Sequence, residues 1–146
     1  MNPLTTTLTL HLLVCMSLTA TSEAAIKMHR ARVVVTNYLN GGLDLTIHCK
    51  SKNDDLGVLV LHPHNDFKFS FRPNFWGTTL IYCSMSWDSE LHWFDIYIDN
   101  RDLNKCNDAC RWIVQEQGPC LFNRTSNKYD ICYPWNQSSM TMKNIN

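Results

Sequence analysis

Apolar and polar residues alternate with a period of two in several separate stretches of the chain. In residues 43–49 every second side chain is apolar, and the side chains between them are polar or charged. Residues 67–71 repeat the pattern, with three phenylalanines alternating with a lysine and a serine. Successive side chains of a β-strand point to opposite faces of its sheet, so each stretch is predicted to be a strand with one buried face.

Six further stretches are rich in Val, Ile, Tyr, Trp and Thr, the residue types enriched in strands. They are residues 33–38, 57–61, 78–87, 91–98, 111–116 and 129–133. Turn-forming residues separate the strands at 40–42, 53–55, 62–66, 72–74 and 118–119. Helical periodicity is hard to find after residue 24, which disfavours a parallel sheet with crossover helices. The pattern predicts an all-β fold, a small disulfide-stabilised antiparallel β-sandwich with Greek-key-like connections and about eight strands, or else a flattened barrel.

The N-terminal 24 residues have the features of a secretory signal peptide. An uncharged, mostly apolar run occupies residues 8–18 and is too short for a helix that spans a bilayer core of about 30 Å. Ser22 and Ala24 supply the small residues of a cleavage site, so we expect cleavage after Ala24. An N-terminal hydrophobic strand or tail is the alternative. We therefore expect a signal peptide at 1–24, one β-sandwich domain at 25–136 and a flexible tail at 137–146.

The charges of the chain are balanced, with 13 Lys and Arg residues against 13 Asp and Glu residues. Binding to nucleic acid or to an anionic membrane needs clustered, uncompensated cations, so neutrality argues against both. After residue 24, charged or polar residues interrupt every apolar run before it reaches the length of a membrane span. We expect a secreted, extracellular monomer with no membrane insertion and no nucleic-acid partner.

The chain has seven cysteines, of which Cys15 would leave with the signal peptide. The six that remain are Cys49, Cys83, Cys106, Cys110, Cys120 and Cys132. Because their number is even and the secretory route is oxidising, three disulfides are expected among them. Sequence alone does not choose the pairing, and the cysteines inside strands are expected to join the two sheets. Zinc bound through Cys106 and Cys110 is the alternative, but no second close cysteine pair completes a tetrahedral site. We expect no metal and no other cofactor.

Residue types that could support catalysis do not converge on a template. His48 and Cys49 are neighbours on a strand, so their side chains point to opposite faces, and Cys49 is expected to be oxidised. His62 and His64 flank a proline in a predicted turn, where a solvated turn is preferred to a metal or proton-transfer role. The aspartates are interpreted as turn and strand-end residues and not as a glycosidase pair: Asp54, Asp55, Asp95, Asp99 and Asp102. We expect no enzymatic activity; a secreted ribonuclease-like hydrolase and a carbohydrate-binding module with exposed aromatic residues are the alternatives.

Asn-x-Ser/Thr sequons occur at Asn123 and Asn136, both in predicted loops, and in a secreted protein both are expected to carry N-glycans. All five tryptophans lie in the second half of the chain, and most are expected in the core. Trp93 shares a predicted strand face with Asp95, which makes it a candidate for exposure.

A tentative partner-binding epitope surrounds the hairpin predicted at residues 86–92. Two aromatic groups and two carboxylates meet there, a mixture suited to interface anchors: Trp87, Asp88, Glu90 and Trp93. In the alternative interpretation, the two tryptophans only pack the base of the hairpin.

Six strings in order and in register resemble the plant self-incompatibility S-protein homologue family. They are HCKSKNDDLG from His48, FKFSF from Phe67, TLIYCSMSW from Thr79, FDIYIDNRD from Phe94, CRWIVQEQGPC from Cys110 and CYPWN from Cys132. Together the strings cover nearly all of residues 33–136, and six separated motifs are far more specific than any one of them.

The resemblance implies a secreted β-sandwich stabilised by disulfides that acts as an extracellular signalling ligand. It implies as partner a protein receptor at a cell surface, because the founding members of the family are recognised at the pollen surface. The matching strings are scaffold residues, so the partner-binding surface is expected in the loops between them. The candidate loops are residues 37–42, 61–66, 86–92 and 123–128.

Overall fold

The computed structural model describes residues 2–20, 30–106 and 108–137 of the chain. An N-terminal helix, α1 (Pro3–Ala20), precedes the β domain, and none of the described helices is long and apolar enough to cross a membrane. The signal-peptide cleavage site predicted after Ala24, and the tail predicted at 137–146 apart from its first residue, lie outside the described residues.

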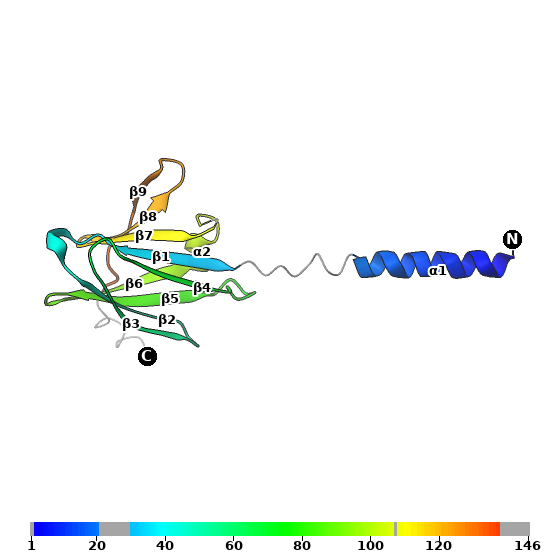
Figure 1. The fold of residues 1–146 in the computed structure, drawn as a ribbon, viewed down its shortest axis with the longest axis horizontal. Helices are drawn as coiled ribbons and strands as arrows, with labels where there is room; N and C mark the ends of the chain where they lie inside the picture. The colour runs from blue at the N-terminus through cyan, green and yellow to red at the C-terminus, as the bar shows by residue number, and fades with distance from the viewer. Residues whose placement is uncertain (1, 21–29, 107, 138–146) are drawn as a thin grey trace.

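The described part of the domain contains nine strands, with one short helix, α2 (Asp99–Asp102), and one 3-10 turn, η1 (Asn40–Gly42), between them (Figure 1). The strands are β1 (Ala31–Asn37), β2 (Leu45–Lys50), β3 (Asp55–Leu61), β4 (Asp66–Phe71), β5 (Leu80–Trp87), β6 (Glu90–Ile98), β7 (Cys110–Gln115), β8 (Gly118–Asn123) and β9 (Lys128–Cys132). A five-stranded sheet has the order β4-β1-β7-β8-β9, and a four-stranded sheet has the order β3-β2-β5-β6. The prediction of an all-β fold built from two sheets is confirmed.

β8 is the strand that the sequence pattern did not predict. It starts at the Gly118–Pro119 pair, which was expected to form a turn. The turn lies two residues earlier, at Glu116 and Gln117, so that Gln115 pairs with Gly118 across a two-residue hairpin loop. Gly118 has a φ of 137°, and a Cβ atom there would collide with the carbonyl oxygen of Tyr133. Glycine is therefore required at this position by a close backbone approach inside the sheet, and not by a turn.

One strand pairing departs from the antiparallel prediction. β1 and β7 are parallel, with Val33 opposite Cys110 and Asn37 opposite Val114. All of the four-stranded sheet lies between β1 and β7 in the chain, so no tight hairpin forces the two strands to run in opposite directions.

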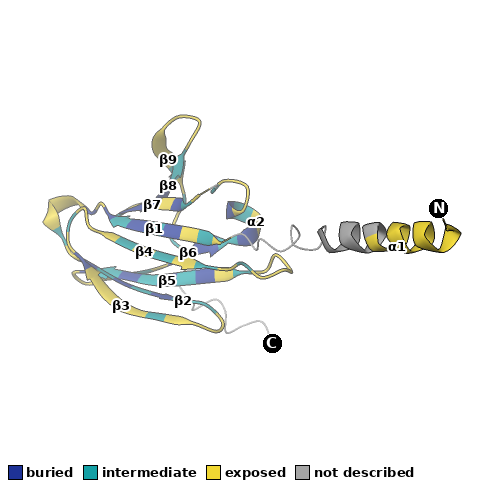
Figure 2. Cartoon of the chain, turned by 45° about the vertical axis from the view of Figure 1, so that its right-hand side comes forward, coloured by how far each residue is buried: buried dark blue, intermediate teal, exposed yellow. Residues whose placement is uncertain are grey.

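Buried residues recur along β1, β5 and β7 (Figure 2). The core that they form between the sheets is rich in aromatic and branched side chains. Trp112, Ile47 and Met85 are completely buried in it. The three phenylalanines of β4 pack against this core but remain half-buried, because β4 is an edge strand. β3, the edge strand of the other sheet, is exposed along most of its length (Figure 2).

The six predicted cysteines form three disulfides: Cys49–Cys83, Cys106–Cys110 and Cys120–Cys132. The expectation that they join the two sheets is wrong. Cys49 and Cys83 are opposite one another on the neighbouring strands β2 and β5, and Cys120 and Cys132 occupy the same relation on β8 and β9. The third bridge closes a local loop before β7, so packing between the sheets depends on the apolar core.

Candidate functional site

The predicted epitope at the β5–β6 hairpin is divided among three environments. Trp87 is only 6% exposed, and its ring stacks on His92 at 4.9 Å and lies 5.8 Å from Trp135. Its assignment as a partner-binding residue is therefore corrected: Trp87 packs the base of the hairpin. Asp88 and Glu90 are exposed at the tip, where Asp88 has a positive φ of 46° and Glu90 accepts a hydrogen bond from His92.

Trp93, in contrast, is 40% exposed on the outer face of the four-stranded sheet. Its strand alternates inward Phe94 and Ile96 with outward residues, as the sequence pattern indicated. The Trp93 ring lies 6.3 Å from that of Tyr82 on the neighbouring strand β5. The structure thus separates Trp93 from Trp87, which the sequence pattern had grouped.

The most exposed aromatic residues of the domain occupy the β4–β5 loop, residues 72–79, which was absent from the candidate loops. Phe75 is 90% exposed and Trp76 is 82% exposed, and the two rings contact edge to face with centroids 5.6 Å apart. The sequence did contain a clue, because a Phe-Trp pair follows Pro73 and precedes a glycine, where no strand alternation would bury it.

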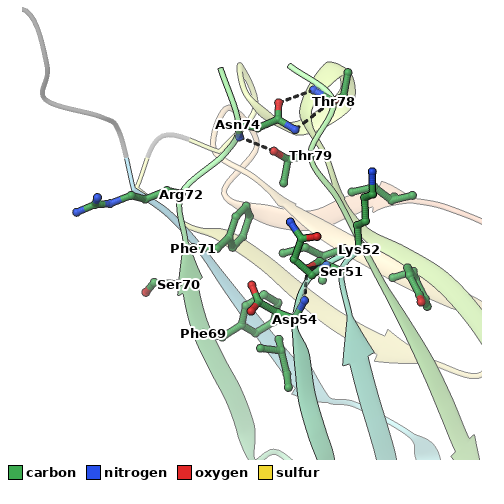
Figure 3. A pocket seen from close by; sticks show the side chains of 15 residues that line it. Ser51, Lys52, Asp54, Phe69, Ser70, Phe71, Arg72, Asn74, Thr78 and Thr79 are labelled. Carbon is green, nitrogen blue, oxygen red and sulfur yellow. Dashed lines mark hydrogen bonds between the residues drawn. The ribbon is translucent and has the colours of Figure 1, made fainter. Parts of the chain in front are cut away.

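Side-chain hydrogen bonds fix the shape of this loop (Figure 3). The Asn74 side-chain amide donates to the Thr78 hydroxyl at 2.9 Å, and its oxygen accepts from the Thr78 backbone N–H at 3.0 Å. The Asn74 backbone N–H donates to the Thr79 hydroxyl at 2.7 Å. Gly77 turns the chain with a φ of 68°, a conformation that glycine adopts without steric cost. The two aromatic side chains are therefore presented from a loop with its ends tied together.

A groove of about 540 Å³ lies beside this loop, between the edge strand β4 and the turn from β2 to β3. Phe69 and Phe71 point into it, whereas Arg72 points away (Figure 3). Polar residues of the β2–β3 turn line the opposite side, with Ser51 accepting a hydrogen bond from the backbone N–H of Asp54 at 3.0 Å. A groove with an apolar floor and polar rims has the composition of a binding site for an organic group or a partner side chain.

The carboxylate of Asp55, the first residue of β3, contacts two hydrogen-bond donors and a lysine ammonium group. Its carboxylate accepts hydrogen bonds from the Gly57 N–H at 2.9 Å and from the His48 ring at 2.6 Å, and lies 3.1 Å from the Lys50 ammonium. These contacts, the Gly57 bond first, hold the pKa of Asp55 well below its ordinary value.

A second histidine–aspartate pair lies at the open end of the β2–β3 hairpin. His62 pairs with Asp44 at 2.8 Å, and this pair shares no residue with that of His48 and Asp55; neither pair contacts a thiol, because Cys49 is disulfide-bonded. Within the described residues, no group of three or more His, Cys, Asp or Glu side chains is placed to hold a metal ion.

The two buried aspartates of α2 have structural contacts. Asp102, completely buried, accepts from the Arg101 guanidinium at 2.7 Å and from the Ile98 backbone N–H at 2.9 Å. Asp99 accepts from the backbone N–H of Thr79 at 3.1 Å, which ties α2 to the base of the β4–β5 loop. Burial and the adjacent Asp99 carboxylate raise the pKa of Tyr97 above its ordinary value.

The two sequons differ in environment. Asn123 ends β8 half-buried, and its side-chain oxygen accepts from the Thr125 N–H at 2.9 Å. Asn136 is exposed; its backbone N–H donates to Trp93 and its side-chain amide donates to Asp95 at 3.1 Å. Asn136 thus joins the C-terminal segment to β6, the edge strand of the four-stranded sheet.

Comparison with solved structures supports the fold. A structure of self-incompatibility protein homologues, described there as a widespread family of small, highly stable, secreted proteins from plants, matches with a TM-score of 0.51 and 18% identity. The match covers 77% of this chain and 100% of the solved chain. At this level of identity the likeness establishes the fold.

Sequence comparison establishes the family. The chain is 44% identical to S-protein homolog 2 of Arabidopsis thaliana, over 82% of this chain and 76% of the relative. It is 45% identical to S-protein homolog 5 of the same plant, over 73% of this chain and 79% of the relative. The family model "Plant self-incompatibility protein S1" matches residues 32–135. The chain therefore belongs to the plant self-incompatibility protein S1 family.

Proposed function

We propose that this protein is a secreted extracellular recognition protein that binds a protein on the surface of a plant cell. Membership of the self-incompatibility S1 family supports the proposal, together with the signal peptide expected at residues 1–24. Three disulfides in so small a domain are typical of proteins made in an oxidising compartment.

The observation that carries the proposal is the exposed pair Phe75 and Trp76. Large aromatic side chains dominate the binding energy of protein interfaces when they insert into a partner. Their exposure of 90% and 82% leaves almost all of their apolar surface available for burial in a complex. The hydrogen bonds of Asn74 restrict the loop before binding, so less conformational entropy is lost when a partner is bound.

The groove beside the loop extends this surface. It offers apolar burial on Phe69 and Phe71, within a rim of backbone and side-chain polar groups. An interface with two protruding aromatic anchors and an adjacent pocket has the anatomy of a protein-binding hot spot surrounded by contacts that exclude water. We therefore place the centre of the partner-binding surface on residues 72–79 and not on the β5–β6 hairpin.

The proposal is tested by the binding of fluorescently labelled mature protein to plant protoplasts. Truncation of a hot-spot aromatic residue costs about 2 kcal/mol or more, which corresponds to a loss of about thirty-fold in affinity. We expect Phe75→Ala and Trp76→Ala each to cause a loss of this size without changing the far-UV spectrum. Trp93→Ala is the matched control, an exposed tryptophan outside the loop. Equal weakening by all three variants, or by Trp93→Ala alone, would contradict this assignment.

A further inference from the structure

A hollow of about 300 Å³ lies between the segment that joins α2 to β7 and the β8–β9 hairpin, which projects from the body of the domain (Figure 1). This volume is that of about ten water molecules in the liquid, which is enough for one sugar unit. The residues that line the hollow are all different from those that line the groove beside the β4–β5 loop. The hollow is therefore separate from the proposed protein-binding surface.

Three cationic side chains and one carboxylate line the hollow: Lys105, Arg111 and Arg124, with Asp108. Asp108 lies between the two arginines, with one carboxylate oxygen 3.6 Å from a nitrogen of Arg111 and the other 3.6 Å from a nitrogen of Arg124. Both distances exceed the length of a charge-assisted hydrogen bond, about 2.7–2.9 Å, so the carboxylate saturates neither guanidinium group. The chain is neutral as a whole, but positive charge exceeds negative charge around this hollow.

The charged groups are accessible to a ligand. The side chains of Arg111 and Arg124 are 50% and 55% exposed, and that of Asp108 is 66% exposed. The Lys105 ammonium donates to the Tyr133 hydroxyl at 3.1 Å and forms no ion pair with a carboxylate among the described residues. A guanidinium group forms two parallel hydrogen bonds with a planar carboxylate, so an incoming carboxylate can replace Asp108 between the arginines.

Aromatic side chains complete the wall of the hollow. Phe122 on β8 and Tyr129 on β9 are opposite one another in the hairpin, with ring centroids 5.1 Å apart, and Tyr129 is 37% exposed. A tyrosine ring offers an apolar face to the C–H groups of a sugar, and its hydroxyl donates and accepts hydrogen bonds as sugar hydroxyls do. The hollow thus places an aromatic ring beside groups that bind a carboxylate.

We propose that this hollow binds a uronic acid unit of an anionic polysaccharide. Arg111 and Arg124 hold the carboxylate of the uronate, Lys105 adds a third positive charge, and the sugar ring packs on Tyr129. An acidic peptide could use the arginines but leaves the aromatic ring without a partner, so the ring favours a sugar. Asp108 opposes ligands of high charge density, which argues against nucleic acid and against an anionic membrane.

The experiment is a calorimetric titration of the purified mature protein with hexagalacturonate. We expect saturable binding that weakens as the salt concentration rises, because salt screens exposed charges. Fully methyl-esterified hexagalacturonate keeps the sugar rings but has no carboxylates, and it should not bind. Hexaglutamate has carboxylates without rings, and it should bind about tenfold more weakly than hexagalacturonate because it makes no contact with the aromatic ring.

Variants of the two arginines locate the site. Arg111→Gln and Arg124→Gln should each weaken hexagalacturonate binding about tenfold, the loss expected for a hydrogen bond to a charged group. The second substitution leaves the sequon of Asn123 intact. Arg72→Gln is the matched control, because it makes the same change of charge at an exposed arginine outside the hollow, and it should bind as wild type does.

Asp108→Asn should bind hexagalacturonate more tightly than wild type, because it removes the carboxylate that competes for the two arginines. The loop variants Phe75→Ala and Trp76→Ala should leave this binding unchanged. The proposal is overturned if hexagalacturonate does not bind, or if hexaglutamate or the esterified hexamer binds equally well. It is also overturned if the control substitution weakens binding as much as the two arginine variants do, if Asp108→Asn weakens it, or if the loop variants abolish it.

Discussion

Removal of each disulfide in turn should destabilise the protein in an order set by the loop that the bridge closes. Cys49–Cys83 spans 34 residues of sequence, Cys120–Cys132 spans 12, and Cys106–Cys110 spans 4. A bridge lowers the entropy of the unfolded chain, and a longer closed loop loses more. Each pair is replaced by two alanines, so that no free thiol remains to form a new bridge.

The chain-entropy model gives about 3.8 kcal/mol for Cys49–Cys83, about 2.8 for Cys120–Cys132 and about 1.9 for Cys106–Cys110 at 25 °C. Packing should widen the difference, because Cys49 and Cys83 are both completely buried, whereas Cys132 is exposed. Alanine in place of the two buried sulfurs leaves a cavity in the core, which adds to the loss.

Urea unfolding followed by tryptophan fluorescence measures the three variants against wild type. We expect the free energy of unfolding to fall least for the Cys106 and Cys110 variant and most for the Cys49 and Cys83 variant. The m-value must be compared as well, because a change would show that the unfolded chain has expanded. A loss for the Cys106 and Cys110 variant that equals or exceeds the loss for Cys49 and Cys83 would refute the loop-closure reasoning.

Three further outcomes are expected. Because the folded state lowers the pKa of Asp55, its carboxylate stabilises the protein above the unfolded-state pKa, near 3.8, and this stabilisation is lost as the pH falls through the folded-state pKa. The difference in urea midpoint between wild type and Asp55→Asn should therefore shrink from pH 7 to pH 2, and an unchanged difference would contradict the lowered pKa of Asp55. Arg101→Met leaves the buried Asp102 carboxylate without its guanidinium and should cost about 3–5 kcal/mol in urea unfolding, whereas a loss below 1 would show that the carboxylate is solvated. When the protein is expressed through a plant secretory route, Asn123→Gln and Asn136→Gln should each lower its apparent mass on a gel by one glycan. A variant that migrates as wild type does would show that the substituted asparagine carries no glycan.

Most of the strand framework could be predicted from period-two alternation, because that pattern follows from burial of one face. It succeeded where a strand has one buried and one open face, as in β2, where Leu45, Ile47 and Cys49 are buried. It missed β8, in which Gly118, Pro119 and Cys120 are all buried, so no alternation marks the strand. Pairing partners, including the parallel contact of β1 with β7, depend on tertiary packing and leave no local trace.

The candidate site was less predictable for the same physical reason. Trp87 and Trp93 belong to one hairpin but to different strands, so their spacing in the sequence does not show whether they lie on the same face of the sheet. In the structure Trp87 enters the core and Trp93 faces solvent. Phe75 and Trp76 were overlooked because aromatic residues usually bury, and only the three-dimensional course of the loop shows that they do not. Pro73 and Gly77 on either side of the pair indicate a loop, whereas the extent to which the two rings are exposed depends on the course of that loop in the fold.

The most direct test of the account is whether binding of the mature protein to plant cells depends on a cell-surface protein. Protoplasts are suited to it because they lack wall polysaccharide, so adsorption to the cell wall does not contribute to the measurement. We predict saturable binding that unlabelled wild-type protein competes for, that unlabelled Trp76→Ala protein does not, and that brief trypsin treatment of the protoplasts abolishes. Binding that survives trypsin, or that both competitors displace equally, would contradict recognition of a surface protein through the loop of Phe75 and Trp76.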